Sequence, residues 1–197
     1  ETMLLRLFRG TGVDGLSGLN KRRSLGKGEI IRPFLNLSKT DLKMYIDANH
    51  LTCVEDETNT NNDFDRNYLR NEIIPLLDKR WKKLSQRASF TSLTAKKKKL
   101  SLDFMLENNF KKQISTGIME RSDFLNVPPF LTEELIRLII RKKGIATPNQ
   151  KVLSEIMNVF FNKKPSNDSY VEWSRKDGEQ IGGKAFSEHN NIILQKK

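Results

Sequence analysis

The 197 residues are enough for one or two domains with buried cores. An excess of 35 Lys and Arg over 24 Asp and Glu gives a formal net charge of +11, which predicts a polyanionic partner, usually a nucleic acid and sometimes a membrane surface; a basic protein without such a partner is the alternative. No apolar run is long enough to cross a bilayer, and the single cysteine, Cys53, excludes an internal disulfide and favours the cytoplasm.

The first predicted elements alternate between regular structure and loops. Residues 1–8 place apolar side chains at helical spacing, and the glycines within residues 10–18 end that helix. Residues 21–28 are expected to form a basic loop. Residues 29–35 predict a short strand in which Pro33 marks the end or an edge.

Two further helices are expected before the composition changes. Ser38, with Asp41 three positions later, predicts a capped helix start. A polar tract over residues 55–65 separates that helix from another over residues 66–77, which Pro75 must kink or restart.

A change in composition near residue 80 predicts a domain boundary. Residues 79–102 contain nine basic residues and no acidic one, which favours a long connecting helix. We therefore expect one domain over residues 1–82 and a second over residues 83–197.

Helices and then short strands are expected in the second domain. Thr132 predicts the capped start of one helix, and residues 147–148 open the next with a proline in its first turn. Residues 170–173 and 192–194 are typical of short strands, and residues 177–178, Asp-Gly, predict a hairpin turn.

A glycine-rich segment after the first helix matches the residue pattern of a nucleotide-binding motif but not its structural context. Residues 10–15 read Gly-x-Gly-x-x-Gly. The dinucleotide fingerprint follows a strand and opens a helix, whereas this segment follows a helix. Two interpretations remain, namely a backbone nest that binds phosphate beside Arg9 and a flexible loop that ends the helix.

Oxygen-rich side chains gather over residues 56–65, without the acidic spacing and central glycine of a calcium loop. The tract is either a cluster that holds an amine or a metal–nucleotide, or a solvated loop. Next to it, Arg66 and Arg70 lie on one helical face with Asn67 nearby, a spacing that suits phosphates or carboxylates. A surface face paired to neighbouring aspartates is the alternative.

Other polar and reactive residues give weaker indications. Four consecutive lysines from residue 96 are interpreted as a patch of point charges for a nucleic-acid backbone, with a solvated helix face as the alternative. His50 and His189 lack metal-ligand spacing and are expected at the surface or at caps. Cys53 is expected to be a small buried apolar residue. No metal held by side chains is predicted.

In this order the segments resemble one family, the tRNA(Ile)-lysidine synthetases, a branch of the PP-loop ATP pyrophosphatases. Residues from about 85 onward resemble the family's helical substrate-binding domain mainly in layout. The first eighty residues carry the specific resemblance, in Glu1-Thr2, Leu4-Leu5-Arg6-Leu7, Arg9-Gly10-Thr11-Gly12, Gly15-Leu16, Gly18-Leu19, Ile31-Arg32-Pro33-Phe34-Leu35, Ser38-Lys39, Glu55-Asp56-Glu57-Thr58-Asn59, Arg66-Asn67, Leu69-Arg70 and Ile74-Pro75-Leu76-Leu77.

The resemblance implies a fold and a reaction. The expected fold is mixed: the remnant of an α/β PP-loop domain (adenine nucleotide alpha-hydrolase-like), followed by a mainly α-helical substrate-binding domain with a short β-hairpin tail. The implied reaction uses ATP with Mg²⁺ to adenylate the wobble cytidine of the CAU anticodon of tRNA(Ile). Free L-lysine then displaces AMP, which changes the codon read from AUG to AUA.

The resemblance also implies roles for particular residues. The predicted catalytic or lysine-binding residues are Asp56, Glu57 and Asn59, with Asp56 placed first. The predicted ATP-binding residues are Glu1, Arg9, Gly10, Gly12 and Arg32. The predicted tRNA-binding or loop-ordering residues are Arg66, Asn67, Arg70, Lys96, Lys97, Lys98 and Lys99.

The family's Ser-Gly-Gly-x-Asp-Ser phosphate loop, and the His and Asp stretch that precedes Glu1-Thr2, are not found in the sequence. We therefore expect further protein before Glu1 and no ATP turnover by this chain alone. Two alternatives remain. A tRNA thiolase of the PP-loop class is disfavoured by the single cysteine, and a non-catalytic basic RNA-binding module would share the positive charge. The oligomeric state stays open.

Overall fold

The computed structural model describes residues 1–25, 28–54, 56–166, 168–174 and 181–197. The chain divides into two compact units, Glu1–Ser101 and Leu102–Lys197, called unit 1 and unit 2. This division falls inside the long helix Leu84–Asn109. The domain boundary that the sequence predicts, between residues 82 and 83, stays a prediction. The hairpin turn expected at residues 177–178 lies outside the described residues.

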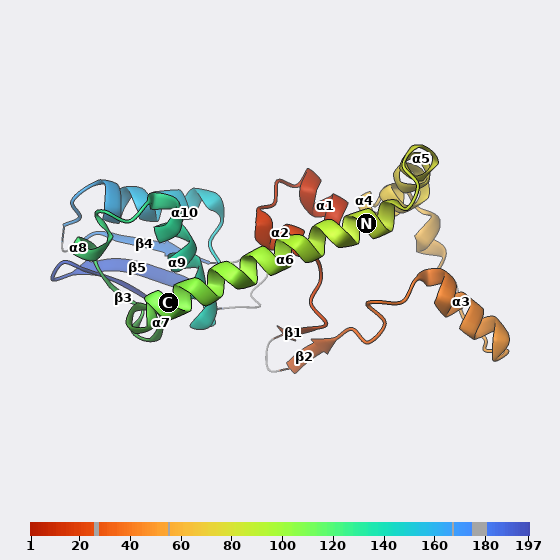
Figure 1. The fold of residues 1–197 in the computed structure, drawn as a ribbon, viewed down its shortest axis with the longest axis horizontal. Coiled ribbons are helices and arrows are strands. Elements are labelled where there is room, and N and C mark those ends of the chain that lie inside the picture. The colour runs from red at the N-terminus through yellow and green to blue at the C-terminus, as the bar shows by residue number, and fades with distance from the viewer. Residues whose placement is uncertain (26–27, 55, 167, 175–180) are drawn as a thin grey trace. The chain divides into compact units, whose positions relative to one another are not determined.

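Unit 1 is built mainly from short helices (Figure 1). A two-stranded antiparallel ribbon follows the first two helices, and the long helix α6 closes the unit and continues into unit 2. Its elements are α1 (Thr2–Phe8), α2 (Val13–Leu16), β1 (Arg22–Leu25), β2 (Gly28–Ile31), α3 (Lys39–Ala48), the 3-10 helix η1 (Glu57–Thr60), α4 (Asp65–Tyr68), the π-helix η2 (Leu69–Ile73), α5 (Ile74–Arg80) and α6 (Leu84–Asn109).

The ribbon corrects two expectations. Residues 22–25, expected in a loop, form strand β1, because they pair with β2 in the register Arg22↔Ile31 to Leu25↔Gly28. Strand β2 ends at Ile31, earlier than the expected residue 35. Pro33 begins a turn there, since it has no backbone N–H to donate to a ladder.

Local signals place the other helices of unit 1 correctly. The Ser38 hydroxyl accepts a hydrogen bond from the Asp41 amide (3.0 Å), and the Asp41 carboxylate accepts one from the Ser38 amide (2.9 Å), which completes the capping box of α3. The helix expected over residues 66–77 is present as α4, η2 and α5 in succession. Pro75 lies in the first turn of α5, where its missing N–H costs no helical hydrogen bond.

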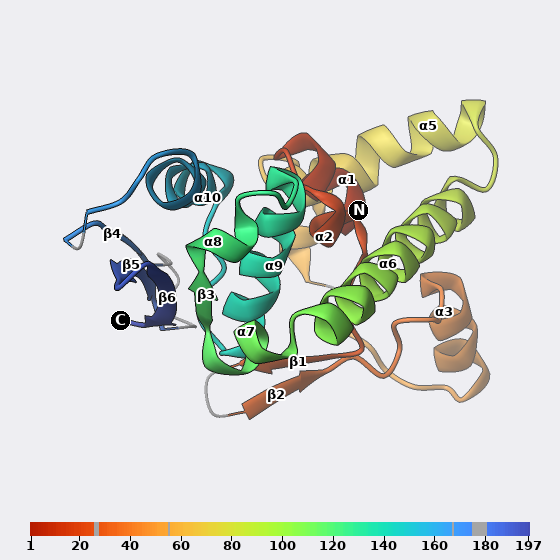
Figure 2. The same ribbon diagram turned by 60° about the vertical axis from the view of Figure 1, so that its left-hand side comes forward.

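Unit 2 contains helices and a four-stranded antiparallel sheet in the order β3-β6-β5-β4 (Figure 2). The sheet replaces the short hairpin tail expected from the sequence, because β3 and β5 join the two predicted strands. Its elements are α7 (Lys111–Thr116), β3 (Ile118–Glu120), α8 (Arg121–Phe124), α9 (Pro129–Lys142), α10 (Gln150–Met157), the π-helix η3 (Asn158–Asn162), β4 (Tyr170–Trp173), β5 (Gly183–Glu188) and β6 (Asn191–Lys196).

One face of this sheet forms the core of unit 2. Alternate residues of the strands are buried, as in Val171, Ala185 and Leu194, and they belong to one apolar cluster with the inner faces of α9 and α10. The Trp173 indole N–H lies in this core and donates to the Ala146 carbonyl oxygen. The buried face therefore fixes the register of the strands.

Two predicted helix starts in unit 2 are wrong. Helix α9 begins at Pro129, and Thr132 lies within its first turns, buried, instead of capping it. Helix α10 begins at Gln150, because the Asn149 side chain accepts a hydrogen bond from the Val152 amide (2.9 Å) and caps it. Among the described residues no helix is long and apolar enough to cross a membrane.

Candidate functional site

A carboxylate at the start of α1 is clamped by two arginines from the helical stretch formed by α4 and η2. Arg70 donates from Nε to Glu1 Oε1 (2.7 Å) and from Nη2 to Oε2 (3.0 Å), and Arg66 donates from Nε to Oε2 (3.1 Å). These bonds, led by the one from Arg70, lower the pKa of Glu1 from 4.5 to about 2, although partial burial acts in the opposite direction. Glu1 is therefore an anion over the whole physiological range.

The same helical stretch also orders the acidic segment. Arg70 Nη1 donates to Asn59 Oδ1 (3.3 Å), and the buried Asn67 amide donates to the carbonyl oxygens of Thr58 (2.7 Å) and Asn61 (2.9 Å). Asn67 thus satisfies two backbone acceptors, which holds η1 against α4. These contacts join the two segments, and the functional role of Asn67 and Arg70 stays a prediction.

Asp56 begins the η1 turn and is exposed. Its Oδ1 accepts hydrogen bonds from the Thr58 amide (2.9 Å) and hydroxyl (2.7 Å), which lower the pKa of Asp56 below its ordinary value. Glu57 and Asn59 follow in the same exposed turn. Asp56 is the N-cap of η1, and within this turn the Asn59 amide oxygen contacts Arg70.

The glycine-rich segment is anchored by Arg6, which was not among the predicted site residues. Arg6 Nη1 donates to the carbonyl oxygens of Gly15 (2.9 Å) and Gly18 (3.0 Å). Gly10 has φ +71°, which favours glycine, and a Cβ on Gly10 or Gly12 would meet nothing within 4 Å. The segment links α1 to α2, which agrees with the rejection of a dinucleotide fingerprint.

Arg9 and Arg32 occupy different surroundings. Arg9 pairs with Asp65 (2.8 Å), so it lies against the start of α4, near the clamp on Glu1. Arg32 donates from Nη1 to the Asn20 carbonyl oxygen (3.1 Å), just beyond the end of β2. The structure therefore brings Arg9 together with the α4 residues and places Arg32 at the end of the β ribbon.

The four lysines of α6 do not form one uniform patch. Lys99 pairs with Asp14 (2.6 Å) and Lys96 donates to Asn20 Oδ1 (3.4 Å), so these two lysines connect α6 to α2 and to the loop that follows α2. Lys97 and Lys98 are exposed on the same helix. A separation of three residues returns to nearly the same helical face, which explains why Lys96 and Lys99 share a role.

Several expectations about single residues need correction. Arg66 and Arg70 bind a carboxylate, that of Glu1, and not the neighbouring aspartates of the alternative interpretation. Cys53 is exposed, because it lies in an extended segment outside any helix or strand. His189 lies in the β5–β6 turn and is exposed, as predicted.

Sequence reasoning also missed the residues that organise the loops, namely Arg6, Asp14, Asn20 and Thr58. Thr58 offered a local signal, because a hydroxyl two residues after an aspartate often closes an Asx turn. Arg6, Asp14 and Asn20 each lie nine or more residues from their partners in the sequence, so no local sequence pattern predicts these contacts.

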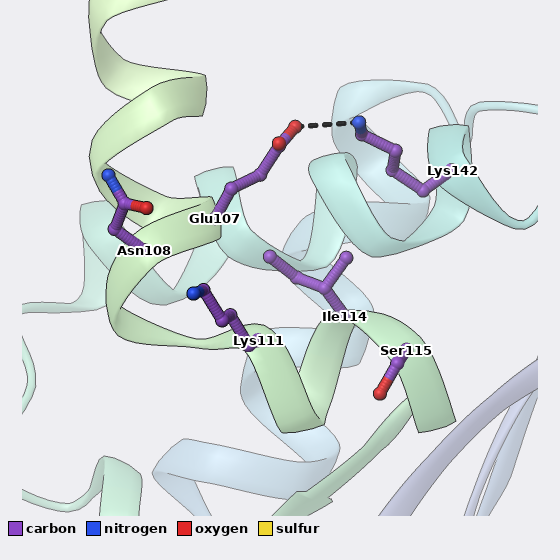
Figure 3. Close-up of a pocket in the computed structure, with 6 residues that line it drawn as sticks. All are labelled: Glu107, Asn108, Lys111, Ile114, Ser115 and Lys142. Carbon is purple, nitrogen blue, oxygen red and sulfur yellow. Dashed lines mark ion pairs between the residues drawn. The ribbon is translucent and has the colours of Figure 1, made fainter.

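A separate shallow pocket lies in unit 2. Its volume is about 250 Å³, and Figure 3 shows Glu107 and Lys142 paired across one side (2.7 Å). Lys111 and Ser115 lie along α7 below them. None of the predicted catalytic or ATP-binding residues lines this pocket. Among the described residues there is also no group of three His, Cys, Asp or Glu side chains that could hold a metal ion.

Comparison with known protein families identifies the domain to which the clamp region is similar. Residues 1–77, which contain the arginine clamp, the glycine loop and the acidic turn, match the PP-loop domain. The part of the chain that carries the clamp is thus similar to PP-loop proteins.

The particular relatives are tRNA(Ile)-lysidine synthases. The chain is 35% identical to the protein of that name from Coxiella burnetii, over 98% of the chain and 44% of the relative. The corresponding values are 35%, 100% and 45% for the Wigglesworthia glossinidia brevipalpis protein, and 33%, 87% and 39% for that of Buchnera aphidicola subsp. Schizaphis graminum. The chain thus spans less than half of the length of these relatives.

Proposed function

We propose that the chain takes part in lysidine synthesis on tRNA(Ile). The reaction uses ATP to adenylate the wobble cytidine of the CAU anticodon, after which the L-lysine amine displaces AMP and the codon read changes from AUG to AUA. The observation that carries this proposal is the similarity to tRNA(Ile)-lysidine synthases over nearly the whole chain, with the PP-loop match over the residues that form the clamp.

The positions of these residues support separate roles in binding lysine and in binding ATP. Asp56 and Glu57 present carboxylates that attract the lysine ammonium, and Arg70 fixes their turn through Asn59. Arg9, next to the glycine-rich segment, pairs with Asp65 but is 70% exposed, so its guanidinium is accessible to phosphate oxygens. Arg32 supplies a second guanidinium at the end of β2. Mg²⁺ accompanies ATP and neutralises phosphate charge.

The positive charge of the chain supports an RNA substrate. The net charge of +11 provides a long-range attraction to phosphates, and the exposed Lys97 and Lys98 add point charges on α6. The proposed location is the cytoplasm, where such a tRNA would be modified.

A chimeric protein tests the proposal. Residues 1–197 replace the matching region of the Coxiella burnetii relative, and lysidine formation is measured on tRNA(Ile) with a CAU anticodon, ATP and L-lysine. The chimera should form lysidine, and Asp56→Ala should reduce the rate at least a hundredfold while the fold is retained. Asp47→Ala, an exposed aspartate on α3, is the matched control. Full activity of the Asp56→Ala protein would remove Asp56 from the mechanism.

A further inference from the structure

The outer face of the four-stranded sheet in unit 2 carries a row of apolar residues. The row consists of Tyr170, Phe186, Ile193 and Ile118, one from each of β4, β5, β6 and β3. The register pairs each of these residues with the next, so all four side chains point to the same face of the sheet. Their neighbours along the strands, such as Val171, belong to the core with α9 and α10, so the row lies on the face opposite these helices (Figure 2).

Two aromatic rings at one end of the row are accessible from water. Tyr170, on the edge strand β4, is 61% exposed, and Phe186 beside it is half-buried. Three gaps between strands of about 4.8 Å each make the row about 14 Å long. It is one residue wide, because polar side chains take the next positions on this face, namely Glu172, Lys184 and Gln195 on one side and Glu120, Glu188 and Asn191 on the other.

The dimensions of this row favour a nucleic-acid strand over a protein surface. A stable protein interface buries about 800 Å² on each partner, which a strip one residue wide does not provide. Two or three unpaired bases fit the length of the row, and aromatic side chains on the open face of an antiparallel sheet are suited to stack with them.

A lysine lies over both aromatic rings. Lys184 Nζ is 4.7 Å from the centroid of the Tyr170 ring and 5.8 Å from that of Phe186. The same ammonium is 3.6 Å from Glu172 Oε1, and Lys197 Nζ is 2.7 Å from Oε2. Two cations and one carboxylate therefore border this side of the row, whereas two glutamates border the other. A phosphate that approaches the face is drawn to the lysine side.

We propose that this face of unit 2 binds unpaired nucleotides of an RNA. Their bases stack on Tyr170 and Phe186, and a phosphate lies beside Lys184. In the free protein the Lys184 ammonium covers the rings, and in the complex a base takes that place while the ammonium pairs with the phosphate. The inference rests on the proposed function, which makes a tRNA the partner. It adds base contacts to the contacts by charge alone that Lys97 and Lys98 offer.

Binding of a fluorescein-labelled, single-stranded RNA of about eight nucleotides to the whole chain tests the proposal by fluorescence anisotropy, without ATP or lysine. Tyr170→Leu and Phe186→Leu keep an apolar side chain and remove the ring, so each should weaken binding about tenfold. Tyr45→Leu, at a tyrosine of α3 that is 63% exposed, is the matched control and should leave the affinity unchanged. The same RNA paired with its complement should bind the four proteins equally, because its bases are no longer accessible.

Substitutions of the charged residues should act in opposite directions. Lys184→Gln should weaken binding severalfold and lower the salt slope by about 0.7, because one phosphate is no longer neutralised. Glu172→Gln should strengthen binding severalfold, because it removes the anion that competes with phosphate for both lysines. Misfolding does not explain a gain in affinity. Lys151→Gln, at an exposed lysine of α10, is the control for loss of a charge and should leave the slope unchanged.

Crosslinking locates the bases directly. An RNA that contains 5-iodouridine should form adducts at Tyr170 or Phe186 under ultraviolet light, as read by mass spectrometry of the peptides. Adducts only elsewhere overturn the proposal, and so do ring substitutions that leave single-strand affinity unchanged or weaken duplex binding equally.

The proposal is also overturned if sedimentation shows self-association of the chain that Tyr170→Leu abolishes while RNA affinity stays unchanged, because the face is then a protein interface. None of these assays requires catalysis. A chimera that fails to form lysidine therefore rejects the proposed function without deciding whether bases bind this sheet.

Discussion

Glu1 and Arg70 are 69 positions apart in the sequence and are joined by two hydrogen bonds of 2.7 and 3.0 Å, one to each carboxylate oxygen. This two-point contact joins the start of α1 to η2, and the same guanidinium continues to Asn59 in the acidic turn. A single arginine thus relates the first residue of the chain to the residues proposed to hold lysine.

Acid should weaken this contact within a defined pH range. The pKa of Glu1 is lowered from 4.5 to about 2 in the folded protein, so the pair stabilises unit 1 fully above pH 4.5 and loses its contribution as the pH falls toward 2. After allowance for partial exposure, this contribution is about 1–2 kcal/mol. In the chimera, Glu1→Gln should lower stability at pH 7 by this amount and flatten the pH dependence between 4.5 and 2, as followed by hydrogen exchange of α4.

Glu29 offers a matched control for that measurement, because it pairs with Arg22 at 3.5 Å and is 42% exposed. Glu29→Gln should change stability by less than about 0.5 kcal/mol. An equal effect of the two substitutions would show that the clamp on Glu1 has no special strength.

Arg6→Ala in the chimera should loosen the glycine-rich loop. The substitution removes the donor to the Gly15 and Gly18 carbonyl oxygens and should cost about 1–2 kcal/mol locally. Limited proteolysis should then cut between residues 10 and 20 several times faster. Arg23→Ala, in the β ribbon, is the comparison for loss of a charge elsewhere, and an unchanged cutting rate in the Arg6→Ala protein would contradict the proposed anchor.

The exposed and the tethered lysines of α6 should behave differently. Replacing Lys97 and Lys98 with Gln in the chimera should make tRNA binding less sensitive to salt, by about one unit of log–log slope for each phosphate that is no longer neutralised, with little change in stability. Lys99→Gln should instead loosen α2, because it breaks the pair with Asp14. Filter binding at several salt concentrations measures the salt dependence of tRNA binding for both proteins. An unchanged slope for the protein with Lys97 and Lys98 replaced would show that these residues do not contact RNA phosphates.

In unit 2, Trp173→Phe should remove one buried hydrogen bond while keeping an aromatic ring in the core. The Ala146 carbonyl oxygen then loses its indole donor, which should cost about 1–3 kcal/mol. Urea unfolding of the chain, followed by circular dichroism, measures the change. Trp81→Phe is the control, since Trp81 is 50% exposed, and it should shift the midpoint little.

Local chemistry made some features predictable from the sequence. Ser38 and Asp41 lie within one helical turn, so their capping box could be identified from two letters. Pro75 had to restart a helix, because its missing N–H and fixed φ act wherever it lies. The resemblance to the PP-loop family indicated which segments to consider as the site, because no single motif identified them.

Tertiary pairing accounts for what the sequence did not reveal. Residues 22–25 contain two arginines and a serine and show no apolar alternation, so β1 exists only through its partner β2. Likewise, β3 has three residues and depends on pairing with β6. The ties from Lys99 to Asp14 and from Arg70 to Glu1 join distant segments, and only the folded chain shows which lysines remain exposed.

The exposure of Cys53 has a practical consequence for experiments on this protein. It is the only thiol of the chain and lies three residues before Asp56. A maleimide fluorophore would therefore attach at one position without any engineering. Its emission would report how the neighbouring acidic turn responds when lysine, nucleotide or RNA is added.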